Sequence, residues 1–213
     1  YGCDQTWLKD LAHYWANEFD WRSVESRLNS FDHCSTEIDG QNFHFIHQRS
    51  PHEEALPLVL NHGWPGSVTE FLKVIEPLTD PVAYGGDPSD AFHVIAPSLP
   101  GYGWSEPPRE KGWGVNRTAS ALVALMGRLG YEKYGVQGGD WGSMVSRHMA
   151  HLDQDKVVGC HVNMMAAGPA GNDDDFEDIS PAEQQHFDRS TWYAAADNGY
   201  FRVQETRAQP HGK

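Results

Sequence analysis

Short apolar runs alternate with longer amphipathic stretches through the middle of the chain. The apolar runs are rich in Val, Ile, Leu and Phe, and they predict strands at residues 43–47, 58–60, 92–95, 134–136 and 157–162. Between most of these runs, apolar residues recur at three- and four-residue spacing, which predicts helices at 68–78, 118–129 and 143–152. Strands that alternate with helices favour a mainly parallel sheet covered on both faces, so the predicted fold class is α/β.

The two ends of the chain carry helical patterns of their own. Near the start, large apolar residues stand three and four positions apart, with charged residues between them, and predict a packing helix; they are Trp7, Leu8, Leu11, Trp15 and Phe19. After the last predicted strand, residues 166–178 contain Gly, Pro and an acidic run, and they predict a linker. Residues 181–193 then predict a further helix.

Composition excludes several classes of function. The 213 residues carry a net charge of −14, which disfavours nucleic acid and anionic membrane surfaces as partners. Cys3, Cys34 and Cys160 are odd in number and far apart, so they indicate neither a disulfide framework nor a zinc site, and they favour a reducing, cytoplasmic location. No apolar run reaches the roughly 18 residues of a membrane-spanning helix. No His-Glu-x-x-His pattern occurs, so no metal is expected.

The most informative motif is Val-Gln-Gly-Gly-Asp-Trp-Gly-Ser at residues 136–143. Small residues flank Asp140 two positions away on each side, which is the spacing of a nucleophile elbow, a sharp strand-to-helix turn that exposes one reactive side chain. A carboxylate, with an ordinary pKa of about 3.9, is ionised at neutral pH and attacks strained or leaving-group-bearing carbon. The motif therefore favours the opening of an epoxide or a halide over ester or peptide cleavage. The alternative is that Asp140 only caps the helix that follows.

A second motif, His-Gly-Trp-Pro-Gly-Ser at residues 62–67, directly follows the apolar run 56–60. In hydrolases with such an elbow, the loop after an early strand supplies one backbone N–H of an oxyanion hole, and the residue after the nucleophile supplies the other. Trp64 and Trp141 are thus the predicted donors, for the carbonyl oxygen of an ester formed on Asp140. The loop and pocket around them are predicted to be formed by His62, Gly63, Pro65 and Gly139. The peptide bond before the proline is a candidate for the cis form, and the alternative for the whole motif is an ordinary Gly/Pro turn.

With these motifs the chain resembles the microsomal type of epoxide hydrolase, which includes the juvenile-hormone epoxide hydrolases. The resemblance covers nearly all of the chain, from residues 21–29 through Pro-Gly-Tyr-Gly-Trp-Ser at 100–105 to Gly-Tyr-Phe-Arg-Val-Gln-Glu-Thr at 199–206. Its most specific parts are Gly-Trp-Pro-Gly-Ser at 63–67 and Gly-Gly-Asp-Trp-Gly at 138–142. The resemblance implies an α/β-hydrolase fold, in which residues 1–34 end an amino-terminal segment, 35–165 form the first part of the core, and 166–213 form a linker and the start of a lid.

The resemblance also implies roles for individual residues. Tyr200, shortly before a Gln-x-Thr stretch, matches a lid tyrosine that donates a hydrogen bond to the epoxide oxygen while the carboxylate attacks. Without the resemblance, a packing aromatic is the simpler interpretation of Tyr200. The family also has an acid and a histidine after the lid, and we expect both beyond Lys213, together with a second lid tyrosine. The chain is therefore expected to be an amino-terminal portion that cannot complete turnover by itself.

The predicted function is the hydrolysis of a small apolar epoxide to a vicinal diol, with water as the second substrate and an ester on Asp140 as the intermediate. No cofactor is implied, and a homodimer is left open. One alternative is a haloalkane dehalogenase, which shares the aspartate elbow and in which Trp141 would bind the halide. The other alternative is an inactive fragment, or a binding module that traps epoxides without turnover.

Overall fold

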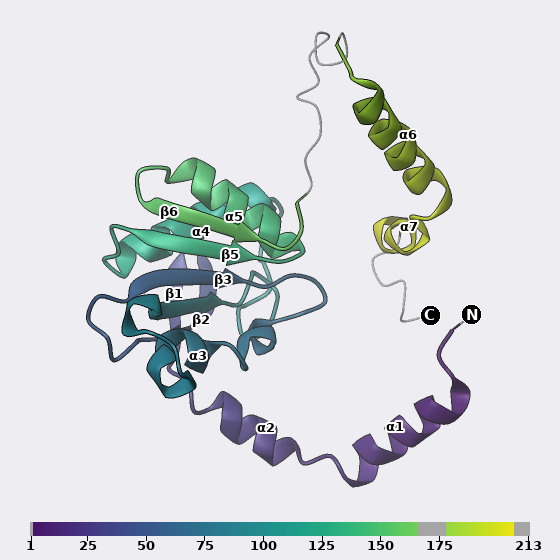
Figure 1. The fold of residues 1–213 in the computed structure, drawn as a ribbon. Coiled ribbons are helices and arrows are strands. Elements are labelled where there is room, and N and C mark those ends of the chain that lie inside the picture. Colours follow the sequence, from purple (N-terminus) through teal and green to yellow (C-terminus); the bar gives the residue numbers. More distant parts are fainter. Residues whose placement is uncertain (1, 166–177, 207–213) are drawn as a thin grey trace. The chain divides into compact units, whose positions relative to one another are not determined.

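The computed structural model describes residues 2–165 and 178–206. The chain separates into two compact units, Tyr1–Met165 and Ala166–Lys213, which are considered one at a time (Figure 1). The predicted linker at 166–178 lies outside the described residues, apart from Asp178.

The first unit is built on a sheet whose strand order is β1-β2-β4-β3-β5-β6. Its strands are β1 (His33–Ile38), β2 (Gln41–Gln48), β3 (Leu56–Asn61), β4 (Phe92–Pro97), β5 (Tyr134–Gly138) and β6 (Val157–Val162). The pairs β4–β3, β3–β5 and β5–β6 are parallel, whereas β1–β2 and β2–β4 are antiparallel. The predicted α/β fold class is confirmed, and each predicted strand is present.

Strand β1 was not predicted, because its residues are mostly polar and it lies at the edge of the sheet. It forms a hairpin with β2, in which Ile38 pairs with Gln41 across a turn of Asp39 and Gly40. Both turn residues have positive φ, 53° and 71°, as the primed two-residue hairpin turns require. An Asp-Gly pair next to a β-type run is a strong hairpin signal, so the sequence did contain the information for β1.

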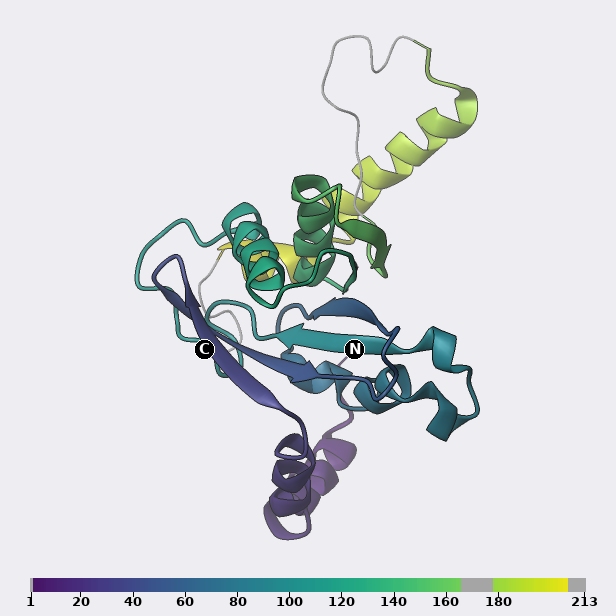
Figure 2. The same cartoon turned by 90° about the vertical axis from the view of Figure 1, so that its left-hand side faces the viewer.

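Helices cover both faces of this sheet. Along each strand, neighbouring side chains point to opposite faces of the sheet. On one face, Val59 and Ile95 form an apolar cluster with residues of α4 (Val115–Arg128) and α5 (Trp141–Leu152). Leu60 and Val94 belong to the other, with the 3-10 helix η1 (Val68–Phe71) and α3 (Ile75–Thr79) (Figure 1 and Figure 2). Burial on both faces explains why the central strands read as continuous apolar runs.

The predicted single helix over residues 68–78 is wrong. The structure has η1 and α3 there, separated by residues 72–74. Pro77 explains the break, because a proline inside a continuous helix has no N–H for the carbonyl of Lys73 and its ring collides with that carbonyl. Two further 3-10 helices follow, η2 (Pro81–Tyr84) and η3 (Pro88–Asp90). The other predicted core helices are present but begin earlier than expected, at Val115 and Trp141.

The amino-terminal residues form α1 (Gln5–Asn17) and α2 (Trp21–Leu28), so the helix prediction there is confirmed. Asp4 and Asp20 cap the two helices by accepting hydrogen bonds from Trp7 N and Arg22 N. The expected packing of the first helix is not observed, since α1 has no buried residue and the Trp15 side chain is 72% exposed.

The second unit contains α6 (Pro181–Ala196) and α7 (Gly199–Thr206). Helix α6 begins with a capping box, in which the Ser180 side chain accepts from Glu183 N and the Glu183 side chain accepts from Ser180 N. The predicted helix at 181–193 is therefore confirmed and extends to Ala196.

Candidate active site

Asp140 lies at a sharp turn between β5 and α5. The strand ends at Gly138 and the helix begins at Trp141, so the chain reverses within two residues. Asp140 has φ 51° and ψ −126°, a conformation that residues with a side chain rarely adopt. The turn is so tight that a Cβ on Gly142 would overlap the carbonyl oxygen of Asn61 and lie 2.6 Å from that of His62. Glycine is therefore required there by the close approach of the loop that follows β3.

The carboxylate of Asp140 faces the His-Gly-Trp-Pro-Gly loop. Its Oδ1 accepts a hydrogen bond of 2.8 Å from the backbone N–H of Trp64, and the Trp64–Pro65 peptide bond is cis. Although Asp140 holds the N-cap position of α5, its side chain makes no capping hydrogen bond. The interpretation of Asp140 as a simple helix cap is therefore contradicted, and the side chain is instead directed to the predicted donor loop.

Gly63 lies against the same carboxylate. A Cβ on Gly63 would overlap Oδ1 of Asp140 and lie 2.8 Å from its Cγ, so this position has no room for a side chain. Trp141, the second predicted donor, is the first residue of α5 and is half exposed, at 49%. The structure thus brings Trp64, Gly63 and Trp141 to Asp140, and the N–H of Trp64 donates a hydrogen bond to its carboxylate.

His62 lies beneath the loop, and its side chain is fully buried. Its Nε2 accepts a 3.1 Å hydrogen bond from the backbone N–H of Leu99, so Nδ1 carries the proton and donates to the carbonyl of Gly63 at 3.0 Å. Burial lowers the pKa of His62, which keeps the ring neutral and suits this pair of bonds. His62 therefore fixes the Gly63 peptide to the loop after β4.

The other predicted loop residues have different surroundings. Pro65 is exposed on the loop. Gly139 lies against Asn163, whose side-chain amide would be 2.9 Å from a Cβ at that position. Neither residue borders the cavity described next.

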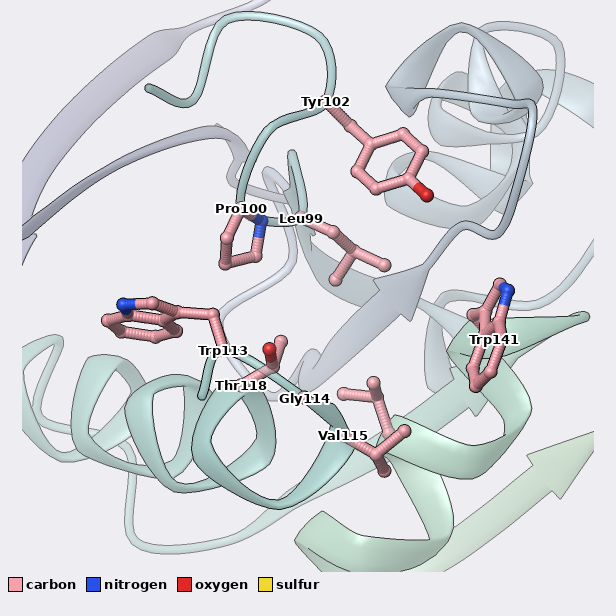
Figure 3. Close-up of a pocket in the computed structure, with 9 residues that line it drawn as sticks. Leu99, Pro100, Tyr102, Trp113, Gly114, Val115, Thr118 and Trp141 are labelled. Atoms are coloured by element: carbon pink, nitrogen blue, oxygen red, sulfur yellow. The ribbon is translucent and has the colours of Figure 1, made fainter. Parts of the chain in front are cut away.

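An apolar cavity of about 230 Å³ lies beside the elbow (Figure 3). Its wall comes from the loop after β4, the start of α4 and the start of α5, through Leu99, Pro100, Tyr102, Trp113, Gly114, Val115, Thr118, Trp141 and Val145. Trp141 belongs both to this wall and to the elbow, so the cavity adjoins Asp140. Its lining suits an apolar substituent.

Tyr102 is a residue of this site that the sequence analysis did not single out. Burial raises the pKa of its phenol, and the negative charge of Asp140 raises it further, so the hydroxyl stays protonated at neutral pH. The ring also packs edge-on against His62, with 5.4 Å between centroids. The available signal was the Pro-Gly-Tyr-Gly turn directly after a strand.

Tyr200 lies on α7 in the second unit, and its side chain is 65% exposed. The two units are described separately, so the role of Tyr200 toward Asp140 stays a prediction.

A chain with this sheet, elbow and loop belongs to the alpha/beta hydrolase fold family, whose model matches residues 57–198. Residues 1–71 match the model of the epoxide hydrolase N terminus. The chain is thus a homologue of the epoxide hydrolases of the microsomal and juvenile-hormone types. The dehalogenase alternative has no such support.

Three relatives illustrate the likeness. Epoxide hydrolase 1 of Oryctolagus cuniculus is 44% identical over 168 residues, which are 77% of this chain and 37% of the relative. The structure of Aspergillus niger epoxide hydrolase has a TM-score of 0.73 and 36% identity, and the match covers 97% of this chain and 53% of that one. The juvenile hormone epoxide hydrolase of the silkworm Bombyx mori has a TM-score of 0.69 and 39% identity over 77% of this chain and 43% of that one. The chain therefore spans about half of these relatives or less.

Two further properties of the described residues bear on function. Within residues 2–165 and 178–206, no helix combines the length and apolar character that a membrane crossing requires. The same ranges hold no group of three or more His, Cys, Asp or Glu side chains that could bind a metal ion.

Proposed function

We propose that the protein is an epoxide hydrolase, or the part of one that carries the nucleophile, and that Asp140 is this nucleophile. The observation that carries the proposal is the 2.8 Å hydrogen bond from Trp64 N–H to Asp140 Oδ1. Asp140, the acceptor, has φ 51°, and its side chain does not cap the helix that follows. A strained backbone that directs a carboxylate at an N–H donor is the arrangement expected of a nucleophile elbow.

The first step is ring opening. Because Oδ1 accepts the Trp64 hydrogen bond, Oδ2 is the oxygen that attacks an epoxide carbon. The carbon–oxygen bond of the ring breaks, and Tyr200 donates its phenolic proton to the released oxygen. The product of this step is a hydroxyalkyl ester on Asp140.

The second step is ester hydrolysis. Oδ1 becomes the carbonyl oxygen of the ester, and it already lies at the N–H of Trp64. When water adds to the carbonyl carbon, negative charge develops on this oxygen, and the N–H groups of Trp64 and Trp141 stabilise it. Collapse of the intermediate releases the vicinal diol and restores the carboxylate. By resemblance to the family, an acid and a histidine of the longer protein activate this water.

The substrate class follows from the cavity beside the elbow. Its volume of about 230 Å³ and its lining of Leu99, Val115 and Val145 suit a small apolar substituent on the epoxide. We assign residues 1–34 to the end of an amino-terminal epoxide hydrolase segment, 35–165 to the first part of the core and 166–213 to the linker and the start of the lid. A homodimer and a cytoplasmic location stay predictions.

Incubation with styrene oxide and, separately, with 1-chlorobutane tests the proposal. Diol formation that requires Asp140 supports an epoxide hydrolase, and an Asp140 ester without diol supports an epoxide trap that stops after the first step. Chloride release without any reaction of the epoxide would instead indicate a dehalogenase and contradict the proposal.

A further inference from the structure

The turn after β4 holds Tyr102 at the wall of the apolar cavity. The backbone N–H of Tyr102 donates to the carbonyl of Leu99 at 2.9 Å, and its own carbonyl accepts from Ser105 N at 3.0 Å. The residues on either side, Gly101 and Gly103, have φ 86° and 52°, a backbone region that favours glycine. The folded turn therefore fixes the point at which the Tyr102 side chain leaves the loop.

The Tyr102 ring extends to the end of the cavity that adjoins the elbow. It packs edge-on against the buried ring of His62, and it lines the cavity together with Trp141. Figure 3 shows its hydroxyl directed away from Trp113 and toward the side of the cavity on which Trp141 lies. Burial raises the pKa of this phenol and the negative charge of Asp140 raises it further, in agreement with that placement. The hydroxyl therefore stays protonated on the nucleophile's side of the cavity.

The hydroxyl of Tyr102 has no hydrogen-bond partner among the residues that the structure describes. Two other buried or half-buried tyrosines of the first unit differ in this respect. The hydroxyl of Tyr131 bonds to Nε2 of His47, and that of Tyr134 donates to Asp153, both at 2.8 Å. A tyrosine hydroxyl that is withdrawn from bulk water usually finds such a partner. Tyr102 therefore offers a free donor to the molecule that occupies the cavity.

The cavity wall is mostly apolar, so its few polar side-chain atoms select the ligand. Besides the phenol of Tyr102, these are the hydroxyl of Thr118 on α4 and the indole of Trp141, whose side chain is half exposed. A protonated phenol donates to an acceptor atom, and an anionic acceptor in this place would be repelled by the carboxylate of Asp140. The chemistry of the wall therefore suits an apolar group that carries one neutral oxygen.

We propose that Tyr102 determines substrate specificity, and that its hydroxyl donates a hydrogen bond to a neutral oxygen in the substituent of the epoxide, such as the ether oxygen of a glycidyl ether. The inference rests on the proposed function, because Asp140 opens the ring of the same substrate. The substituent enters the cavity and its oxygen meets Tyr102, whereas the oxygen of the epoxide ring is left for Tyr200. Tyr102 thus selects and orients the substrate, and no bond is made or broken at its hydroxyl.

The test compares methyl glycidyl ether with propyloxirane, which has a methylene group in place of the ether oxygen and the same chain length. Intact mass gives the rate of ester formation on Asp140 for the wild type, Tyr102→Phe and Thr118→Val. Tyr14→Phe makes the same change at an exposed tyrosine of α1 and is the matched control. We expect the rate ratio of the ether to propyloxirane to fall roughly 5-fold in Tyr102→Phe alone, with the rate for propyloxirane within about twofold of wild type.

The wild type supplies a second comparison that needs no variant. We expect its rate ratio to exceed that of free acetate by roughly 5-fold, because acetate attacks the same two epoxides without a donor at the ether oxygen.

Four results would overturn the role of Tyr102 and leave that of Asp140 intact. They are a wild-type ratio no higher than that of acetate, an unchanged ratio in folded Tyr102→Phe, an equal fall in its rates for both epoxides, and a loss of the preference in Thr118→Val instead. No ester with either epoxide in the folded wild type would overturn the proposed function as well.

Discussion

Trp64 and Asp140, 76 positions apart in the sequence, are joined by one 2.8 Å hydrogen bond from a backbone N–H to a carboxylate oxygen. The bond commits Oδ1 of Asp140 to the loop and leaves Oδ2 for attack. It also puts a donor at the atom that becomes the ester carbonyl oxygen, so the same contact serves both steps of the proposed reaction.

Replacing Gly63 by alanine tests the contact between the loop and the nucleophile. Its new methyl group would overlap the Asp140 carboxyl group, so the carboxylate or the loop must shift. A misplacement of about 1 Å costs roughly 100-fold in rate, and we expect that loss in the rate of ester formation. Stopped incubations with styrene oxide measure the rate, and circular dichroism checks the fold. Alkylation at the wild-type rate would mean that the Gly63 contact is not needed for attack.

Two helical glycines form a matched pair for the packing of the elbow. In Gly142→Ala the new Cβ would overlap the backbone of Asn61, whereas in Gly127→Ala it meets nothing within 4 Å. We expect Gly142→Ala to lower the free energy of unfolding by about 2–4 kcal/mol. Gly127→Ala should raise it by about 0.5–1 kcal/mol, because alanine is the better helix former. Urea titrations measure both, and equal effects at the two positions would show that the elbow is not tightly packed.

Acid should destabilise the protein through its buried histidines. Burial, and secondarily His33, lowers the pKa of His44 from 6.5 to about 4, and His44 binds Ser98 Oγ and His33 Nδ1. Below pH 6.5 the unfolded chain binds more protons at this site than the folded one. The contribution of His44 is therefore fully present above pH 6.5 and is lost as the pH falls toward 4.

We expect His44→Gln to reduce the slope of unfolding free energy against pH in that window, by up to about 1.4 kcal/mol per pH unit. Urea titrations at several pH values between 4 and 7 measure this slope. The same change at exposed His151 serves as the surface control. An unchanged slope in the His44 variant would show that this histidine is not protonated differently in the two states.

Filling the cavity should change substrate preference. Val145 lies on α5 and lines the cavity, so Val145→Phe reduces the space for a bulky substituent. We expect the ratio of reaction rates of styrene oxide to propylene oxide to fall roughly 10-fold. Val82→Phe, at an exposed valine outside the cavity, is the control. Competition between the two epoxides gives the ratio. A ratio equal to that of the control would mean that the substituent of the epoxide does not occupy this cavity.

The elements that could be predicted from the sequence are those whose burial gives them a regular apolar pattern. Strands such as β3 and β4 are covered on both faces, so their apolar runs stand out. The polar edge strand β1 lacked that signal, and its hairpin turn at Asp39 and Gly40 was not recognised. The break at Pro77 was missed because the apolar spacing continues across it, although proline chemistry forbids a continuous helix.

The site was predicted where its residues lie in short motifs, and missed where folding brings distant segments together. The elbow at Asp140 and the donor loop at Trp64 could be read from spacing. Tyr102 could not, because its relation to Asp140 depends on how the loop after β4 folds over the end of the sheet. His62 was predicted to form part of the loop and pocket, and the way its buried ring joins Leu99 and Gly63 could not be read from the sequence.

The most direct test of the account is the position of the covalent adduct after incubation with styrene oxide. Intact mass followed by peptide mapping compares the wild type with Asp140→Asn, a residue that tolerates positive φ. We predict one adduct per chain, on Asp140, that is absent from the folded variant. An equal yield of adduct in Asp140→Asn, or a folded wild-type chain that is never alkylated at Asp140, would contradict the assignment of the nucleophile.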